Sequence, residues 1–457
     1  MAARPLRIAH LIDLAKVGGV ETLYADFIQA PHPDGVPVAH FTVLDSPRMA
    51  ARFVQPVQQY SQQVVSPRQW GGVTLPRRPH GLRAYNRLRL LRKLAPDVIV
   101  AWNQFTDFRR DPLPLPCPLV YYEHGMSWYT HSPRQLSGFL PHIAGAIAAS
   151  EAAAQMLRLK HGVTAPIEVC LNPIRARVLS AHATPRQLDP AAPIRLGWAG
   201  RLVPLKAAGL LVLAVQALRA RGVAAEAVIA GEGAERATVA RLIADTGMGE
   251  HVTLVGLVDD MAAFYRGIDL FISTSMHETL SLVCLEAMAQ GVPVIASQVD
   301  GFPEVIQHGV TGLCLTPTLS VADYAALTGA STAFAPQVYD PASQQLVDTH
   351  LLSPDALADG VLALTRQASV YQAYSTAALA AAHNPVFSPA AFTARLYGAL
   401  GRYGGGCGAG LSLSNNPFKG CETRVSLRSQ PAHQAASIAT GRQSICTPRN
   451  PLVKVPQ

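Results

Sequence analysis

Short β-branched segments alternate with helical or turn-rich segments along most of this 457-residue chain. Six of them lie in the first 175 residues, namely LRIAHLIDL, VAHFTVLDS, DVIVAWN, LVYYEHG, AIAAS and IEVCLN. A second set lies between residues 194 and 315, namely IRLGWAG, AEAVIAGEG, VTLVGL, LFISTS, PVIAS and GLCL. Continuous apolar strands separated by helices are typical of parallel sheets that are covered on both faces. The pattern therefore predicts an α/β protein with two doubly wound, Rossmann-like domains in tandem.

The limits of these domains follow from where the alternation stops. In SAHATPRQLDPAAP, residues 180–193, prolines and small polar residues replace the periodicity, which predicts a hinge. Residues 317–352 also lack the strand–helix rhythm, and we expect a surface insertion there. The expected parts are two domains, a returning helix and a disordered basic tail, at residues 1–180, 190–385, 386–402 and 403–457.

Composition and charge restrict the class of protein. Hydrophobic residues make up 49% of the chain and charged residues 15%, as in a folded globular protein. The formal net charge is +8, but from Tyr403 onward six Lys or Arg residues face one acid, so the tail carries five of these charges. The rest of the chain is close to neutral, which argues against nucleic acid as a partner.

The sequence also predicts a cytoplasmic protein. The longest uncharged apolar stretch, GFLPHIAGAIAAS, is interrupted by Pro141 and Gly145 and is shorter than the ~20 apolar residues of a membrane span. At the start of the chain, Asp13 interrupts the apolar run and a small-residue cleavage site is missing, so we expect no signal peptide. The seven cysteines form no CxxC pair, which favours reduced thiols over disulfides or a zinc site.

Two strand-to-helix turns have residues suited to an anionic ligand. The first expected strand leads to Gly18 and Gly19, where backbone N–H groups can approach a ligand, although glycines here also serve simply to make the turn. The strand at residues 194–200 is followed by Arg201 and Lys206, ahead of an apolar helix. A guanidinium and an ammonium in this place form a plausible clamp for a diphosphate. The alternative is two solvated surface cations.

The segment HETLSLVCLEAM, residues 277–288, has two glutamates as its only acids. Glu278 is expected in a loop and Glu286 in the following helix; on one helix they would lie about 12 Å apart. That is wider than the ~5 to 9.5 Å between glycosidase carboxyls. The spacing suits a nucleoside diphosphate sugar, with hydroxyls at both ends and the diphosphate facing backbone N–H groups near Ser281 and Leu282. A capping glutamate and a solvent-facing glutamate are the alternative.

Longer segments resemble the retaining glycosyltransferases of family 4, which have the GT-B fold with two Rossmann-like domains facing a cleft. The match runs over about 195–315 through GRLVPLKA, AVIAGEGAE, VTLVGLVDDMAAFYRGIDLFISTSMHETLSLVCLEAMAQGVPVIAS and DGFPEVIQHGVTGLCL. The first domain is similar more loosely, through GGVE, YYEHG and AIAASEAAAQML. The likeness therefore covers most of residues 5–400 and excludes the tail.

The resemblance implies roles for residues of the second domain. Arg201 and Lys206 would bind the donor diphosphate. Glu278 would contact the transferred sugar, and Glu286 would hold the ribose. Ser281 stands where the family often has glycine, which adds a side chain near the phosphate but leaves the backbone donor in place.

Further roles follow from the same resemblance. His124 would lie near the donor sugar and Gly19 near the reaction centre, and the backbone at Leu257 and Val258 would line the base. Family members generally work without a bound metal, and the chain has no DxD triplet. No cofactor is expected besides the donor, a UDP- or GDP-sugar. The usual Asn-Gly before the link is here Asn172 followed by proline, which removes one backbone donor.

These features predict retaining, metal-independent transfer of a sugar to a hydroxyl acceptor, in the synthesis of bacterial cell-surface polysaccharide or glycolipid. Two alternatives remain open. One is a sugar-nucleotide 2-epimerase of the same architecture, and the other is a non-catalytic module that binds a sugar nucleotide. The HExxH-like string at His277 has serine at its last position, so a zinc protease is excluded.

A basic stretch between Arg68 and Lys93 bears on the acceptor, which we expect to be a glycan or a lipid-linked sugar. It has no acid and contains Arg77, Arg78, Arg83, Arg87, Arg89 and Arg92. With Leu82, Tyr85, Leu88 and Leu91 it forms a partly amphipathic helix pattern. Such a helix could lie on anionic headgroups at the inner face of a membrane. The alternative is a packed helix with solvated arginines.

Overall fold

The structure is a computed structural model that describes residues 4–76, 78, 81–102, 104–109, 114–179, 183–332 and 334–405. Of the basic tail predicted at 403–457, everything after residue 405 lies outside the described residues, and so does Arg77. Among the described helices, none is both long and apolar enough to cross a membrane.

The first sheet has seven parallel strands in the order β3-β2-β1-β6-β7-β8-β9. They are β1 Leu6–Ile12, β2 Val38–Leu44, β3 Ser61–Val65, β6 Val98–Ala101, β7 Leu119–Glu123, β8 Gly145–Ala148 and β9 Ile167–Val169. All six predicted strands are confirmed. The seventh, β3, escaped prediction because its sequence SQQVV is mostly polar and exposed, as is common at a sheet edge.

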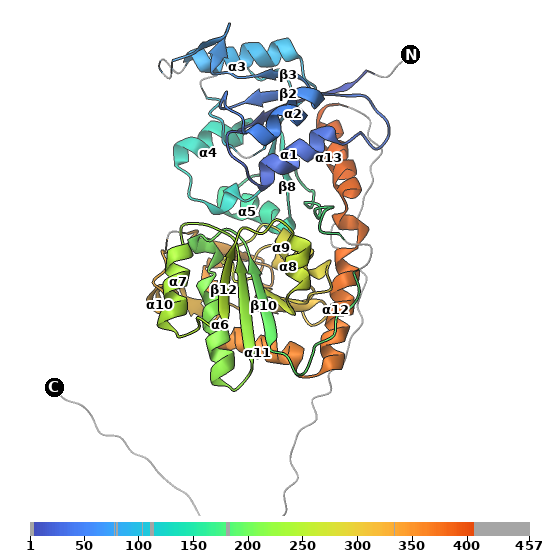
Figure 1. The fold of residues 1–457 in the computed structure, drawn as a ribbon. Helices are drawn as coiled ribbons and strands as arrows, with labels where there is room; N and C mark the ends of the chain where they lie inside the picture. Colours follow the sequence, from blue (N-terminus) through green and yellow to red (C-terminus); the bar gives the residue numbers. More distant parts are fainter. Residues whose placement is uncertain are drawn as a thin grey trace, which may run out of the picture. The chain divides into compact units, whose positions relative to one another are not determined.

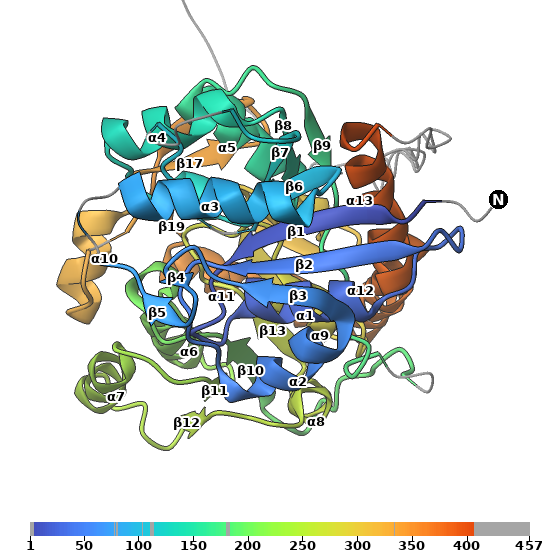
Figure 2. The same cartoon turned by 90° about the horizontal axis from the view of Figure 1, so that it is seen from above.

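Helices cover both faces of this sheet because alternate residues of each strand point to opposite sides. Ile8 and Ile12 pack with α1 (Gly19–Gln29), α2 (Ala51–Tyr60) and α13 (Pro389–Tyr403). Ala9 and Leu11 belong to the opposite layer, together with residues of α3 Gly81–Leu94, α4 Pro133–Phe139 and α5 Glu151–His161. Figures 1 and 2 show α3 and α1 on opposite sides of β2 and β3. The predicted returning helix at 386–402 is thus α13, which packs on the first sheet.

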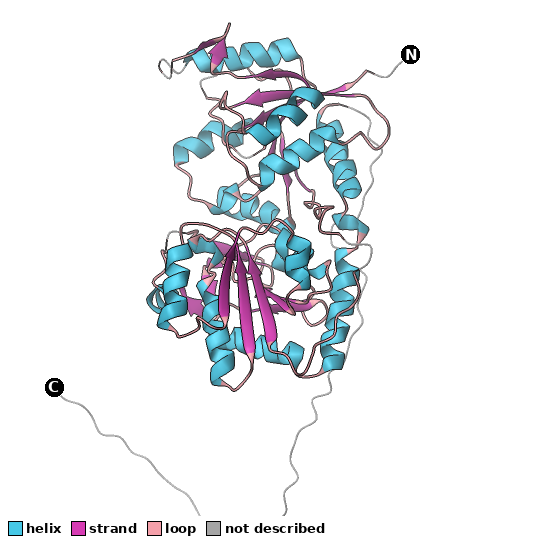
Figure 3. Ribbon diagram, viewed as in Figure 1, coloured by secondary structure: helices cyan, strands magenta, loops and turns pink. Residues whose placement is uncertain are grey.

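The second sheet has six parallel strands in the order β12-β11-β10-β13-β14-β15. They are β10 Ile194–Ala199, β11 Ala225–Ala230, β12 Val252–Gly256, β13 Leu270–Ile272, β14 Val294–Ser297 and β15 Gly312–Leu315. Helices cover both faces of this sheet (Figure 3). One face is covered by α6 Gly209–Ala220, α7 Arg236–Asp245 and α11 Pro354–Thr365. The other is covered by α8 Met261–Arg266, α9 Leu282–Met288 and α12 Ala368–Ala382. All six predicted strands are confirmed, and with them the doubly wound α/β class.

Each sheet has one point where the strand order reverses. In the first sheet this switch point lies between β1 and β6, and in the second between β10 and β13. Ligands of doubly wound sheets bind beyond the carboxyl ends of the strands at such points. The segments that follow these strands are therefore the first places to look for a site.

The insertion at residues 317–352 is more than the expected surface excursion. It contains β16 Leu319–Ser320, α10 Val321–Thr328, β17 Gln337–Asp340, β18 Gln345–Asp348 and β19 His350–Leu351. Val338 and Tyr339 are buried in a cluster that also holds residues of α5 and α9. The sequence pattern did not indicate these elements because the two short strands of the β17–β18 hairpin bury few side chains. Since the same cluster joins residues from the layers of both sheets, the domain limits near 180 and 190 stay a prediction.

Candidate functional site

The switch point of the second sheet brings together Lys206 and Glu278. Lys206 ends a short 3₁₀ turn, Pro204–Lys206, in the segment after β10, and Glu278 lies in the loop after β13. The ammonium forms an ion pair with the Glu278 carboxylate, and each side chain is 19% exposed. Thr274 donates a hydrogen bond to the Lys206 carbonyl at 2.8 Å, which ties the two loops together. A charged pair is therefore fixed where the fold places its ligand.

Arg201 lies on the same segment but does not join this pair. Its side chain is exposed, and among the described residues no acid forms an ion pair with it. Of the two cations of the predicted clamp, the ammonium is paired with an acid and the guanidinium is exposed, and the clamp itself stays a prediction. Both cations follow the same strand.

Glu286 is buried on α9, so the solvent-facing alternative is wrong for this residue. Only 1% of its side chain is exposed, and the Tyr265 hydroxyl donates to Oε2 at 3.2 Å. Arg175 Nε lies 3.5 Å from Oε1. Burial raises the pKa of the Glu286 carboxyl, and the Arg175 guanidinium opposes this shift. Among the described residues Oε1 has no hydrogen-bond donor within bonding geometry, and the Arg175 guanidinium is the charged group beside it.

The start of α9 shows why glycine is common at position 281. Ser281 precedes Leu282, the first helical residue, and has φ +57°, in the left-handed region where a Cβ atom is unfavourable. Its hydroxyl donates to Cys284 Sγ at 3.0 Å, so the side chain is held in place. Serine at this position carries the backbone strain that glycine would avoid.

Asp300 supports the Glu278 loop and was not predicted, although it begins DGFPEV, a segment quoted for the family resemblance. Its carboxylate accepts hydrogen bonds from Glu278 N at 3.3 Å and from Tyr339 N at 2.8 Å. Burial raises the pKa of Asp300 to about 8. The insertion, through Tyr339, therefore helps to fix the loop that carries Glu278.

His124 of the first domain lies next to this loop. The Thr279 hydroxyl donates to the His124 carbonyl at 3.3 Å. The imidazole stacks on Trp102, with ring centres 5.8 Å apart and planes at 7°, and lies against Tyr122. Burial lowers the pKa of His124 to about 3, so the ring is neutral at neutral pH. Among the described residues neither ring nitrogen has a hydrogen-bond partner, although both are buried.

Three further predicted residues lie after other strands. Gly19 begins α1, and a Cβ atom there would meet no atom within 4 Å, so packing within the protein does not require glycine. Leu257 and Val258 follow β12; Leu257 is 80% exposed and Val258 partly buried. Among the described residues no hydrogen bond or ion pair joins any of the three to the side chains of Lys206 and Glu278.

Sequence reasoning also missed Glu304, which joins the two sheet layers. It ends the 3₁₀ turn Phe302–Glu304, and its carboxylate accepts from Glu151 N and Ala152 N, both at 2.8 Å. These N–H groups belong to the first turn of α5, where they have no intrahelical partner. Its position within GFPE, a segment quoted for the family resemblance, was the available signal.

Two family models match the chain. Residues 17–177 match the model described as Glycosyltransferase Family 4, and residues 193–329 match Glycosyl transferases group 1. The chain belongs to the family 4 glycosyltransferases. Among solved structures, this glycosyltransferase is similar to Anabaena HepE in complex with UDP, with a TM-score of 0.63 and 19% identity over 87% of this chain and 100% of that chain. Sucrose-phosphate synthase of Thermosynechococcus elongatus has a TM-score of 0.59 and 18% identity, covering 87% and 98%. These likenesses show the GT-B fold.

Curated relatives are similar over shorter segments. N-acetyl-alpha-D-glucosaminyl L-malate synthase of Bacillus anthracis is 42% identical over 103 residues, which cover 22% of this glycosyltransferase and 27% of that protein. GDP-mannose-dependent alpha-(1-6)-phosphatidylinositol monomannoside mannosyltransferase of Mycobacterium tuberculosis is 40% identical over 122 residues, covering 25% and 32%. The aligned segments thus span about a third or less of these relatives.

Proposed function

We propose that this protein transfers a glycosyl unit from a nucleoside diphosphate sugar to an acceptor hydroxyl with retention of anomeric configuration. The observation that carries the proposal is the Lys206–Glu278 pair at a switch point, beside a neutral histidine with unpartnered ring nitrogens. A donor diphosphate would take the ammonium, and the released Glu278 carboxylate would then accept hydrogen bonds from the sugar.

The same geometry suggests how the leaving group is stabilised. Negative charge grows on the diphosphate as the glycosidic bond breaks, and Lys206 and Arg201 would stabilise it electrostatically together with the backbone N–H groups near Ser281 and Leu282. Glu286 would accept from the ribose. These cations would serve where other transferases use a metal ion, so metal independence is part of the proposal.

His124 acts in this proposal as a positioning group. A ring with a pKa of about 3 is neutral during turnover and can donate one hydrogen bond and accept another. The acceptor's proton would pass to an oxygen of the departing diphosphate, as the family resemblance implies. No protein nucleophile is then needed.

A panel of UDP- and GDP-sugars tests the function. We expect one donor class to raise the melting temperature, because ligands that bind only the folded state stabilise it by mass action. With glycan and lipid-linked acceptors, NMR coupling constants of the product should show the donor's anomeric configuration. Inversion would contradict the retaining mechanism. Formation of an epimerised sugar from donor alone would favour the epimerase, and donor binding without transfer to any acceptor would favour the non-catalytic module.

We also propose peripheral contact with a membrane, in keeping with a role in cell-surface polysaccharide or glycolipid synthesis. Trp70 and Val73 of the β4–β5 hairpin (Gln69–Trp70 and Val73–Thr74) are 40% and 67% exposed, and Tyr85 of α3 is 50% exposed. Trp70 and Tyr85 stack, with ring centres 6.1 Å apart. Exposed aromatic rings beside arginines are typical of surfaces that meet lipid headgroups.

Sedimentation with vesicles tests this contact. We expect binding to vesicles containing phosphatidylglycerol, weakened by salt and by Val73→Asp, which places an acid in the exposed apolar patch. Val310→Asp is the matched control, because Val310 is also exposed, at 44%, but lies in the turn before β15 of the second sheet. Equal binding of both variants, or none by the natural protein, would remove the membrane proposal.

A further inference from the structure

A basic cavity lies at the switch point of the first sheet. It has a volume of about 160 Å³ and is lined by residues at or after the carboxyl ends of β1, β2, β3 and β6 and by residues of α3. Leu11 belongs to β1, and Thr106 follows β6, so the cavity spans the point where the strand order reverses. Its volume is smaller than the ~300 to 1,000 Å³ of sites for drug-sized ligands, and it suits a small group such as a phosphate. Nothing in the proposed donor site uses this cavity.

The lining is strongly cationic. Arg68, Arg83 and Arg87 line it together with a single acid, Asp45, which leaves two net positive charges. Asp45 pairs with Arg68 at 2.6 Å. Guanidinium groups present planar arrays of donors that match the oxygens of phosphate and carboxylate groups.

The helix α3 directs two of these arginines into the cavity and keeps the others away from it. Arg83 and Arg87 are four residues apart and share one helix face. Arg83 donates twice to the Leu75 carbonyl, at 3.2 and 2.6 Å, and Arg87 donates to the Asp107 carbonyl at 2.8 Å. Backbone carbonyls thus fix both side chains. Arg92 lies on the opposite face and is exposed.

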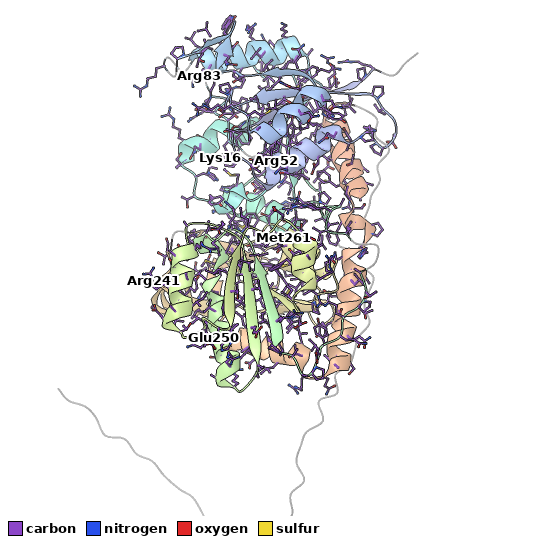
Figure 4. All side chains as sticks on the ribbon, in the orientation of Figure 1. Lys16, Arg52, Arg83, Arg241, Glu250 and Met261 are labelled. Atoms are coloured by element: carbon purple, nitrogen blue, oxygen red, sulfur yellow. The ribbon has the colours of Figure 1, made fainter. Side chains whose placement is uncertain are left out.

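This arrangement differs from both expectations for the basic stretch between Arg68 and Lys93. Its arginines are neither all solvated nor all turned toward a membrane, because two of them line a cavity at the carboxyl edge of the sheet. Figure 4 shows Arg83 beside α3 in the first domain. The exposed patch of Trp70, Val73 and Tyr85 is a separate surface, because Tyr85 is two residues from both Arg83 and Arg87 and therefore lies on another side of α3.

We propose that this cavity binds the anionic group, a phosphate or a carboxylate, of the acceptor. The inference rests on the proposed function, since it assigns the first domain's switch point to the acceptor while the second domain binds the donor. The acceptor would then be an anionic molecule whose hydroxyl extends toward the donor sugar. The anionic group can belong to a soluble phosphate ester or to a phospholipid headgroup, and the two sources are separable.

Calorimetry with inorganic phosphate and with glycerol 3-phosphate tests the site, in the presence of a saturating nucleoside diphosphate that fills the donor site. We expect saturable binding of both ligands by the natural protein. Arg83→Gln combined with Arg87→Gln should weaken it by at least about tenfold, since hydrogen bonds to charged groups contribute this much or more. Arg92→Gln, on the opposite face of the same helix, should leave binding unchanged. Absence of binding, or equal binding by both variants, overturns the proposal.

Two additions keep the test decisive. If the double glutamine variant does not fold, Arg83→Lys with Arg87→Lys retains the charge but loses the planar fork, and it should bind phosphate more weakly than the natural protein; unchanged affinity overturns the proposal. Binding of the nucleoside diphosphate is measured for every variant. If it binds and phosphate does not, only the acceptor inference fails; if no nucleoside diphosphate binds the natural protein, the proposed function fails.

Binding to phosphatidylglycerol and phosphatidylcholine vesicles shows whether the anionic group belongs to a lipid headgroup or to a soluble phosphate ester. Tighter binding of phosphatidylglycerol vesicles than of phosphatidylcholine vesicles, lost in the double glutamine variant, assigns the cavity to a lipid headgroup. Glycerol 3-phosphate binding without vesicle binding assigns it to a soluble phosphate ester. Vesicle binding that persists in the double glutamine variant, without glycerol 3-phosphate binding, overturns the proposal.

Discussion

Replacing Lys206 by alanine is expected to lower turnover at saturating donor by about 10²- to 10³-fold, the usual cost of losing one preorganised donor to a developing oxyanion. The ammonium lies at the switch point, where its only ion-pair partner among the described residues is Glu278. Because leaving-group charge is largest in the transition state, the fall in kcat should exceed the loss of donor affinity. Steady-state kinetics with calorimetry of donor binding give both quantities.

The control for this substitution is Lys93→Ala, which removes an exposed lysine at the end of α3 and should leave both quantities unchanged. Equal losses of turnover and donor affinity in Lys206→Ala would show that the ammonium binds donor and transition state alike. The proposed role in leaving-group stabilisation would then be wrong, although a role in donor binding would stand.

The sequence predicted the sheets well because strand formation here depends on local pattern. A continuous apolar run such as that of β1 needs a helical layer on each face of the sheet to bury it. It therefore indicates a doubly covered strand whatever its neighbours in the sheet are. The strand β3 was missed because an edge strand with one buried face needs few apolar residues. Residues 317–352 were misjudged for a related reason, since Val338 and Tyr339 are buried by partners that a local pattern does not reveal.

The site was predictable where it follows a strand and hidden where its partners come from distant segments. Lys206 and Glu278 each follow a central strand of the second sheet, and their pairing follows from the strand order. Arg175 and Asp300 reach Glu286 and the Glu278 loop from other segments, and no local pattern shows which groups they meet. Conformation was equally hidden, because the positive φ of Ser281 is visible only in the structure.

Glu304 connects the layers of the two sheets, and its loss should destabilise the fold. Its two oxygens accept from Glu151 N and Ala152 N, while the Ser150 hydroxyl accepts from Ala153 N, so the first three amides of α5 are all satisfied. Glu304→Ala leaves two amides without acceptors, at about 1 to 3 kcal/mol each. We expect the free energy of unfolding to fall by about 2 to 4 kcal/mol in chemical denaturation. Glu250→Ala, at an exposed glutamate labelled in Figure 4, should cost less than about 0.5 kcal/mol.

The pH dependence of the same contact gives a sharper test. Burial raises the pKa of Glu304 to about 7, against the opposing effect of the two amides. The folded state therefore holds a proton that an unfolded glutamate, with a pKa near 4.3, has released. Stability from this group is complete below the unfolded pKa and is lost as pH rises through about 7. Glu304→Gln does not titrate, so the stability of the natural protein relative to this variant should fall by about 2 kcal/mol between pH 5 and pH 8. A constant difference across that range would mean that the amides, rather than burial, set the proton affinity of Glu304.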